Sequence, residues 1–246
     1  MKTVEELSEA YNKFLGYIEQ YIASPRKEAL LELYNDHAER IMMMPASGTE
    51  HYHNCFVGGY IDHVIRVIDA ALELKAMWER FGATINYTTE ELVFAALNHD
   101  LGKIGTEEAE QYILNDSEWH RKNQGKIYKN NPINSFMTVP DRSLKILADR
   151  GIKVSQNEWF GIKLHDGMYD ESNKPYYISY DVNSRLRTNL PYVLHQADQL
   201  AARVEYEGWY ASQTPSTTPK KKPVLAESLN KEQAGELKNI FDELFK

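Results

Sequence analysis

The 246-residue sequence contains a single cysteine, Cys55, and no long hydrophobic run. One cysteine excludes an internal disulfide framework and a metal cluster built from thiolates. No stretch approaches the apolar length of a membrane span or of the core of a signal peptide, so we expect a cytoplasmic protein that does not contact a membrane. Apolar residues make up 42% of the chain, which is enough for a substantial core.

The chain also lacks an excess of basic residues. Its 28 Lys and Arg residues are outnumbered by 36 Asp and Glu residues, which gives a formal net charge of −8. Sequence-independent binding of a duplex needs many contacts between basic side chains and phosphates, so this balance argues against a duplex DNA partner. A small phosphorylated ligand is compatible with it, because one metal ion and a few cations can hold such a ligand.

Apolar residues recur at intervals of three and four along much of the chain, which predicts an all-α fold. Long helices are expected over residues 4–22 and 26–43. Thr88 and Glu91 have the spacing of a capping box, which should open the helix that contains residues 92–97.

Two segments lack this periodicity. Residues 115–140 are polar and interrupted by Gly and Pro, whereas residues 169–188 are rich in Tyr, Asn and Asp. Long irregular segments in a compact helical domain are more often functional than idle. Both segments are therefore predicted to be long active-site loops.

The chain is expected to form one large domain over residues 1–210. Residues 211–224 have the composition of a flexible linker, and residues 225–246 predict an amphipathic helix. That helix could fold back onto the domain or close a homo-oligomer. Its end, residues 240–245, also resembles the short C-terminal peptides that dock on replication sliding clamps, so a clamp contact is the sharper alternative.

The most informative motif is the adjacent pair His99-Asp100, followed by Gly102 and Lys103. An imidazole nitrogen and a carboxylate oxygen can bind the same divalent cation, and Gly102 lets the chain turn away without a Cβ in the way. A buried histidine beside a capping aspartate would give the same dipeptide without a metal. On the metal interpretation, Asp100 and Lys103 are the candidate catalytic residues.

Two further candidate ligands occupy helical positions that face inward. His63 lies three residues after Tyr60 and four before Val67, on an apolar stripe, where a hydrogen-bonded core histidine is the competing interpretation. Asp198 lies three residues after His195, on a helix face lined by small alanines. Because an unpaired buried carboxylate is costly, Asp198 needs a partner, and a metal ion is a suitable one.

With these residues the chain resembles the HD-domain superfamily of metal-dependent phosphohydrolases. In that family a His, an adjacent His-Asp pair and a late Asp hold the metal, and this order maps onto His63, His99 with Asp100, and Asp198. The match spans roughly residues 50–210. It implies an HD-domain helical bundle with long active-site loops and a C-terminal appended helix.

The resemblance extends to finer features. The segment from His53 to His63, with its Gly-Gly pair, is similar to the approach found in HD-type 3′-to-5′ exoribonucleases and related phage proteins. Many members carry two additional histidines, which His165 and His195 match. If these bind a second ion, Asp100 is placed to bridge the pair. Otherwise they support the ligands from outside or donate hydrogen bonds to phosphate.

A site of imidazoles and carboxylates suits Mn²⁺, Fe²⁺, Co²⁺, Ni²⁺, Zn²⁺ or Mg²⁺, with one or two ions per chain. Such an ion would activate water and polarise a phosphoryl oxygen, so the resemblance implies hydrolysis of a phosphate ester of a nucleotide or short oligonucleotide. The alternatives are a phosphodiesterase or exonuclease acting on single-stranded nucleic acid, a di-iron oxygenase of the same fold, and a binding protein whose metal is structural.

Phosphate charge beyond the metal should meet cations or hydrogen-bond donors. Lys103 is the first candidate because it follows the His-Asp pair by one short turn. Arg142, Lys122, Arg40 and His53 are further candidates, although surface cations are usually only solvated. Aromatic residues of the 169–180 segment could stack on a base, or simply pack against the edge of the domain.

Overall fold

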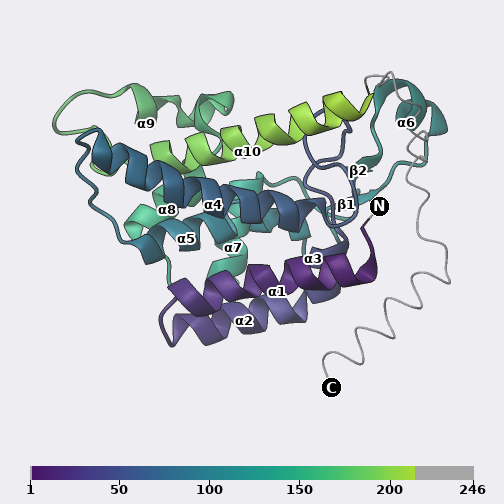
Figure 1. Cartoon of the computed structure of the whole chain (residues 1–246), viewed down its shortest axis with the longest axis horizontal. Coiled ribbons are helices and arrows are strands. Elements are labelled where there is room, and N and C mark those ends of the chain that lie inside the picture. The colour runs from purple at the N-terminus through teal and green to yellow at the C-terminus, as the bar shows by residue number, and fades with distance from the viewer. Residues whose placement is uncertain (1, 214–246) are drawn as a thin grey trace.

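A computed structural model, in which residues 2–213 are described, has the predicted all-α class (Figure 1). The described residues form ten α-helices, three short 3-10 helices and one two-stranded antiparallel hairpin. The elements are α1 (Val4–Tyr21), α2 (Arg26–Asp36), α3 (Ala38–Met43), α4 (Gly59–Arg80), α5 (Thr89–Asn98), η1 (Leu101–Ile104), β1 (Tyr112–Leu114), α6 (Glu118–Gln124), β2 (Tyr128–Asn130), α7 (Val139–Asp149), α8 (Gln156–Leu164), η2 (Gly167–Tyr169), η3 (Glu171–Asn173), α9 (Lys174–Ile178) and α10 (Leu190–Gln213).

Helix α5 is the centre of the bundle. It begins at the predicted capping box, in which Thr88 and Glu91 bond each other's backbone N–H groups, and its residues 92–98 are all buried. A helix that is apolar all round belongs in the interior. It contacts α1, α4, α8 and α10, so the residues that follow its last turn emerge deep inside the domain.

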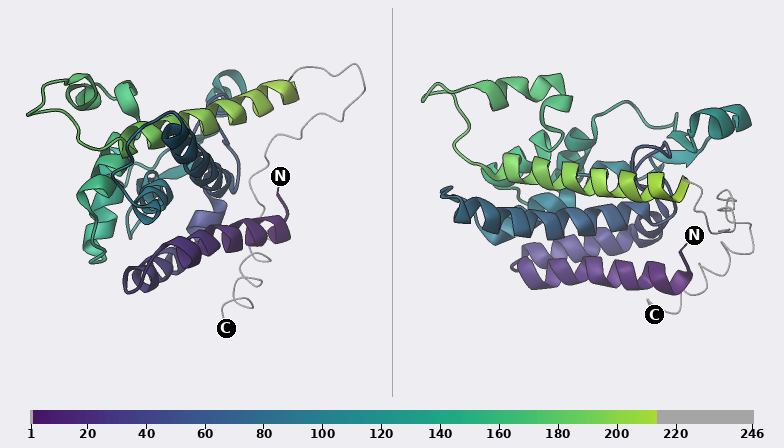
Figure 2. Two further views of the ribbon diagram at one scale, coloured as in Figure 1. Left: turned by 60° about the vertical axis from the view of Figure 1, so that its left-hand side comes forward. Right: turned by 45° about the horizontal axis from the view of Figure 1, so that its top comes forward.

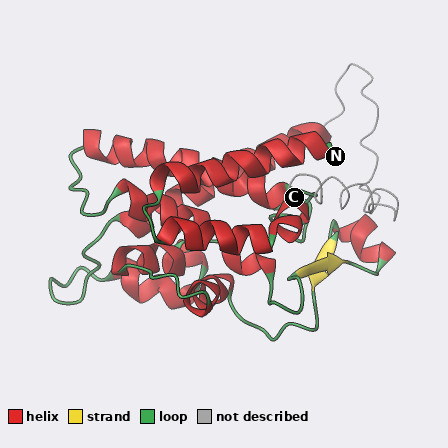
Figure 3. Cartoon of the chain, turned by 90° about the horizontal axis from the view of Figure 1, so that it is seen from below, coloured by secondary structure: helices red, strands yellow, loops and turns green. Residues whose placement is uncertain are grey.

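The other helices surround α5 in layers. Helices α4 and α10 lie side by side along one face, and α1 and α2 lie along the opposite face (Figures 1 and 2). The hairpin and α6 lie at one end of the molecule, and α9 lies at the other (Figure 3 shows the strands beside α6). The α4–α10 pair therefore forms one wall against the end of α5.

The structure corrects one helix prediction. The expected helix over residues 26–43 is divided at His37, whose backbone (φ −113°, ψ 17°) is not helical. Leu33 is buried before the break and Ile41 after it. The spacing of buried residues continues through His37, so periodicity alone does not reveal the break.

The two predicted loops are partly wrong. Residues 115–140 contain α6 and the strand β2, which pairs with β1 so that Ile113 faces Lys129. Helix α6 has no buried residues and is held by its caps, with Ser117 at the start and Gly125 at the end, so it carries no apolar stripe to detect. Residues 169–188 contain η3 and α9.

The domain boundary near residue 210 falls inside a helix, because α10 continues to Gln213 and includes the first residues of the expected linker. The remainder of that linker, the terminal helix over residues 225–246 and its clamp contact lie outside the described residues. Within residues 2–213, no helix combines the length and the apolar character needed to cross a membrane.

Candidate metal centre

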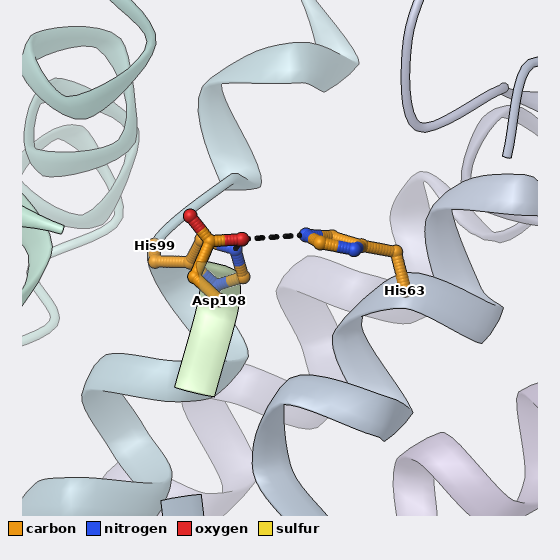
Figure 4. Close-up of side chains that lie close together, drawn as sticks. All are labelled: His63, His99 and Asp198. Carbon is orange, nitrogen blue, oxygen red and sulfur yellow. Dashed lines mark ion pairs between the residues drawn. The ribbon is translucent and has the colours of Figure 1, made fainter. Parts of the chain in front are cut away.

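The predicted ligands His63, His99, Asp100 and Asp198 come together where α4, α10 and the end of α5 meet. The His63 Nε2 atom lies 3.0 Å from Asp198 Oδ1, and His99 Nε2 lies 4.0 Å from the same oxygen. Asp100 Oδ2 lies 3.4 Å from His99 Nε2 and 3.7 Å from His63 Nε2. Figure 4 shows His63, His99 and Asp198 pointing toward one another.

Two nitrogens of this cluster lack hydrogen-bond partners. The Nε2 atoms of His63 and His99 are buried, and neither makes a hydrogen bond with a described residue. His63 Nε2 does approach Asp198 closely, but this contact is not aligned as a hydrogen bond. Buried polar atoms are normally hydrogen-bonded, so two buried nitrogens that face carboxylates without a hydrogen bond call for an explanation. A divalent cation satisfies nitrogen lone pairs and carboxylates together, so these residues fit a metal ion.

Hydrogen bonds fix how two of the imidazoles face. His99 Nδ1 donates to the carbonyl oxygen of Ala96 at 2.7 Å, and His165 Nδ1 donates to that of Ile162 at 2.9 Å. A carbonyl oxygen only accepts, so Nδ1 carries the proton in both rings. The lone pair of each ring is then on Nε2, on the side of the cluster.

Asp100 is kept ionised by its neighbours. Burial alone would raise its pKa, but the Lys103 ammonium, followed by His99, lowers the pKa of Asp100 well below its usual value. Lys103 Nζ lies 2.5 Å from Asp100 Oδ2 and donates to the carbonyl oxygen of Ala46 at 2.7 Å. The Lys103 side chain thus lies beside the cluster and binds Asp100, while its predicted contact with phosphate stays a prediction.

The charges of the cluster favour a cation. Although burial opposes protonation, the Asp198 and Glu205 carboxylates raise the pKa of His63 to about 10. Burial would raise the pKa of Asp198, but His63 and then His99 hold it well below its usual value. Without a metal ion, a proton on His63 partly balances the carboxylates. A bound cation would take over that role.

A second group of donors adjoins the first. His165 Nε2 lies 3.7 Å from Asp100 Oδ1 and 3.6 Å from Asp166 Oδ1. His99, Asp100 and His165 form one set of converging donor atoms, and His165, Asp166 and Asp198 form another. Within each set the donor atoms all lie within 4.8 Å of one another. These overlapping sets offer positions for one ion or two.

His195, a predicted ligand, lies outside these sets of donors. Its Nδ1 donates to the carbonyl oxygen of His165 at 2.8 Å, and its ring packs directly on the backbone of Gly167. Gly167 has a positive φ of 56°, and a Cβ there would collide with the imidazole. The shared helix face with Asp198 was predicted correctly, but the ring is held against the chain after His165, and Asp166 contributes the nearby donor instead.

Arg142 and Arg40 hold the turn that follows the His-Asp pair. Arg142 is buried and donates to the carbonyl oxygens of Gly102 and Ser135. Arg40 donates to the carbonyl oxygen of Ile104 at 3.1 Å. Neither guanidinium is brought into the cluster of donors, and both have main-chain partners, which indicates a structural role.

Lys122 and His53 have very different positions. Lys122 lies on the surface of α6, paired with Glu118, and is not brought to the cluster. The His53 ring lies 4.7 Å from the His63 ring, centroid to centroid, and its buried Nε2 has no hydrogen-bond partner among the described residues. Burial, reinforced by the charges of His63 and Lys103, lowers the pKa of His53 to about 3, so its imidazole is neutral.

Gly102 is required for a different reason from the one the sequence suggested. A Cβ at this position would collide with the carbonyl oxygen of Val139 at the start of α7. The glycine therefore permits close packing of the turn against α7. Ser143 completes this contact: its hydroxyl accepts from Gly102 N at 2.7 Å and donates to the carbonyl oxygen of His99 at 3.2 Å.

The sequence analysis missed Glu205, a buried carboxylate whose Oε2 lies 3.1 Å from His63 Nδ1. A signal was present, because Glu205 follows Ala201 by four residues and Asp198 by seven, on the buried stripe of its helix. An acidic residue on such a stripe needs a partner, by the same argument that identified Asp198.

The cluster opens to solvent on one side. The side chains of His63, His99 and Asp100 are at most 4% exposed, whereas those of Asp198 and Asp166 are 20% and 45% exposed.

In comparisons with known proteins, no family model matches the chain, and no curated protein or solved structure gives a match. The function of this chain therefore has to be inferred from the site itself.

Proposed function

We propose that this protein is a metal-dependent phosphohydrolase of the HD-domain type, acting on a phosphate ester of a nucleotide or short oligonucleotide. The observation that carries the proposal is the convergence of His63, His99 and Asp198, from three separate elements, with two buried Nε2 atoms lacking hydrogen-bond partners. The order of these residues along the chain, with Asp100 after His99, is that of the HD motif.

The donor atoms of the cluster suit a hydrolytic role. When bound, a divalent cation supplies an activated water and polarises a phosphoryl oxygen. Asp100 remains ionised through its contact with Lys103, so it is ready to act as a ligand. The neutral His53 has a free nitrogen beside His63 and is suited to hydrogen bonding with a phosphate or leaving group.

The open side of the cluster suits a nucleotide. Tyr169 is 79% exposed, its ring lies 6.1 Å from that of His195, and its hydroxyl accepts from Gln199 Nε2 at 3.2 Å. It follows the candidate donor Asp166 by three residues along the chain. An exposed aromatic ring near a proposed metal centre is a suitable surface for stacking of a base. This supports a nucleoside phosphate over a simple phosphorylated metabolite.

The test begins with metal analysis of the protein as purified. Metal-free protein is then reloaded separately with Mn²⁺, Fe²⁺, Co²⁺, Ni²⁺, Zn²⁺ and Mg²⁺. Release of phosphate and nucleoside is measured from nucleoside mono-, di- and triphosphates and from short single-stranded oligonucleotides. We expect turnover with at least one metal and none after chelation.

An Asp198→Asn variant serves as the inactive control, and Lys13→Ala, on the exposed side of α1, serves as the control that retains activity. Absence of turnover with every metal and substrate would contradict the proposal. Oxygen uptake by the iron-loaded protein, without phosphate release, would instead support the oxygenase alternative.

A further inference from the structure

Glu205 contacts the face of His63 that points away from the predicted ligands. Its side chain is 1% exposed, its Oε2 lies 3.1 Å from His63 Nδ1, and its Oε1 lies 3.5 Å from Arg66 Nη1. Glu205 and Asp198 are seven residues apart on α10, which is two helical turns and one face of the helix. Two carboxylates of one helix therefore contact opposite nitrogens of one imidazole.

His63 needs such a partner because of its position in α4. His99 and His165 follow the last turns of α5 and α8, where carbonyl oxygens lack intrahelical donors and can accept from Nδ1. His63 is five residues into a helix of 22, where carbonyl oxygens are engaged in the helix itself. The acceptor for its Nδ1 must come from another element, and Glu205 supplies it.

We propose that Glu205 is the positioning residue of the metal centre: its carboxylate fixes the tautomer and orientation of His63, and so sets the affinity for the metal ion. A carboxylate accepts only, so Nδ1 donates, and Nε2 is left facing Asp198 and His99, where a bound cation would replace its proton. A carboxylate on the far nitrogen also strengthens an imidazole as a ligand. Arg66 holds Glu205 from the other side. The inference rests on the proposed metal centre, but not on the reaction.

The test measures Co²⁺ binding to metal-free protein, by calorimetry and by the visible absorption spectrum of the bound ion. Glu205→Met keeps the volume but removes the acceptor, and should weaken Co²⁺ binding by about 10–100-fold with a changed spectrum. Glu205→Gln keeps an acceptor oxygen but not the charge. Its Co²⁺ affinity should be lower than that of the wild type and higher than that of the Met variant. Glu207→Ala, on the exposed side of α10, is the matched control and should bind as the wild type does.

Arg66→Ala should have the smallest effect, because this side chain is 40% exposed and its contact with Glu205 is long. Circular dichroism establishes that each variant is folded. A folded Met variant with wild-type affinity and spectrum would overturn the inference. If the Met variant does not fold, the Gln variant decides alone, and wild-type binding by it overturns the inference. Wild-type protein that binds no divalent ion would defeat the proposed function itself.

Discussion

His99 and His165 lie at the ends of helices, whereas His63 lies inside one, and the three rings are oriented by different means. The helix-end rings donate to carbonyl oxygens of their own chain, three residues back. The mid-helix ring depends on the Glu205 side chain of another helix. A backbone acceptor is retained under any substitution, but a side-chain acceptor can be changed. In the proposed metal centre, the mid-helix His63 is therefore the position at which affinity for the ion can be tuned without replacing a ligand.

Removal of a ligand is the largest test of this comparison. His63→Ala and His99→Ala should each lower metal affinity and turnover by more than about 100-fold, since loss of a ligand exceeds loss of its supporting group. Calorimetric titration and the phosphate-release assay measure the effect, and circular dichroism should show little loss of helix. If one of the two variants retained wild-type affinity, the two kinds of histidine would not belong to one site.

The anchoring of α8 should be separable from the orientation of its terminal His165. Arg26 lies 2.7 Å from Glu158, whose side chain is fully buried near the start of α8. Arg26→Ala leaves this buried carboxylate without its Arg26 cation, so the free energy of unfolding should fall by about 3–5 kcal/mol in urea titrations. Metal affinity of the folded variant should not change. Arg26→Lys, which keeps the charge, is the control. A loss of metal affinity in either variant would show that the anchoring of α8 and the orientation of His165 are coupled.

His53 extends the comparison to a ring with an unpaired Nε2. Its pKa of about 3 lies below the value of about 6.5 expected in the unfolded chain. Between these values the unfolded state binds a proton that the folded state excludes, so stability falls as pH falls, by up to about 1.4 kcal/mol per pH unit. His53→Gln should remove this contribution. Urea unfolding of both proteins in chelator at pH 7, 6 and 5 should show the wild type losing stability faster, whereas parallel losses would contradict this.

Ser143 tests the support of the helix-end histidine His99, with the smallest expected effect on metal affinity. Ser143→Ala leaves the buried Gly102 N–H and the His99 carbonyl oxygen without the hydroxyl that joins them. We expect a loss of about 1–3 kcal/mol in the free energy of unfolding. Affinity for Co²⁺ should change little, because Ala96 still orients the His99 ring. If Ser143→Ala lowered Co²⁺ affinity as much as Glu205→Met does, the helix-end and mid-helix histidines would not differ in how they are supported.

The all-α class, the capping box before α5 and the convergence of the four candidate ligands could be predicted from helical spacing and from the adjacent His-Asp pair. The break at His37 could not, since the spacing of buried residues continues across it. His195 shares a helix face with Asp198, but a shared face does not say which group captures the ring, and the His165 carbonyl oxygen does so. Glu205 pairs α10 with α4, and such a partnership appears only when the helices are packed.

Helix α10 carries both Asp198 and Glu205, and this has a thermodynamic consequence. If α10 moves along α4, Asp198 leaves the cluster and Glu205 leaves His63 in the same movement. In the proposed metal centre, cation binding and the packing of α10 on α4 are therefore linked equilibria, and a saturating ion would stabilise the packed helix by an amount that grows with the logarithm of its concentration. Chelation should accordingly loosen α10 before the rest of the bundle, and faster amide exchange along this helix would record it.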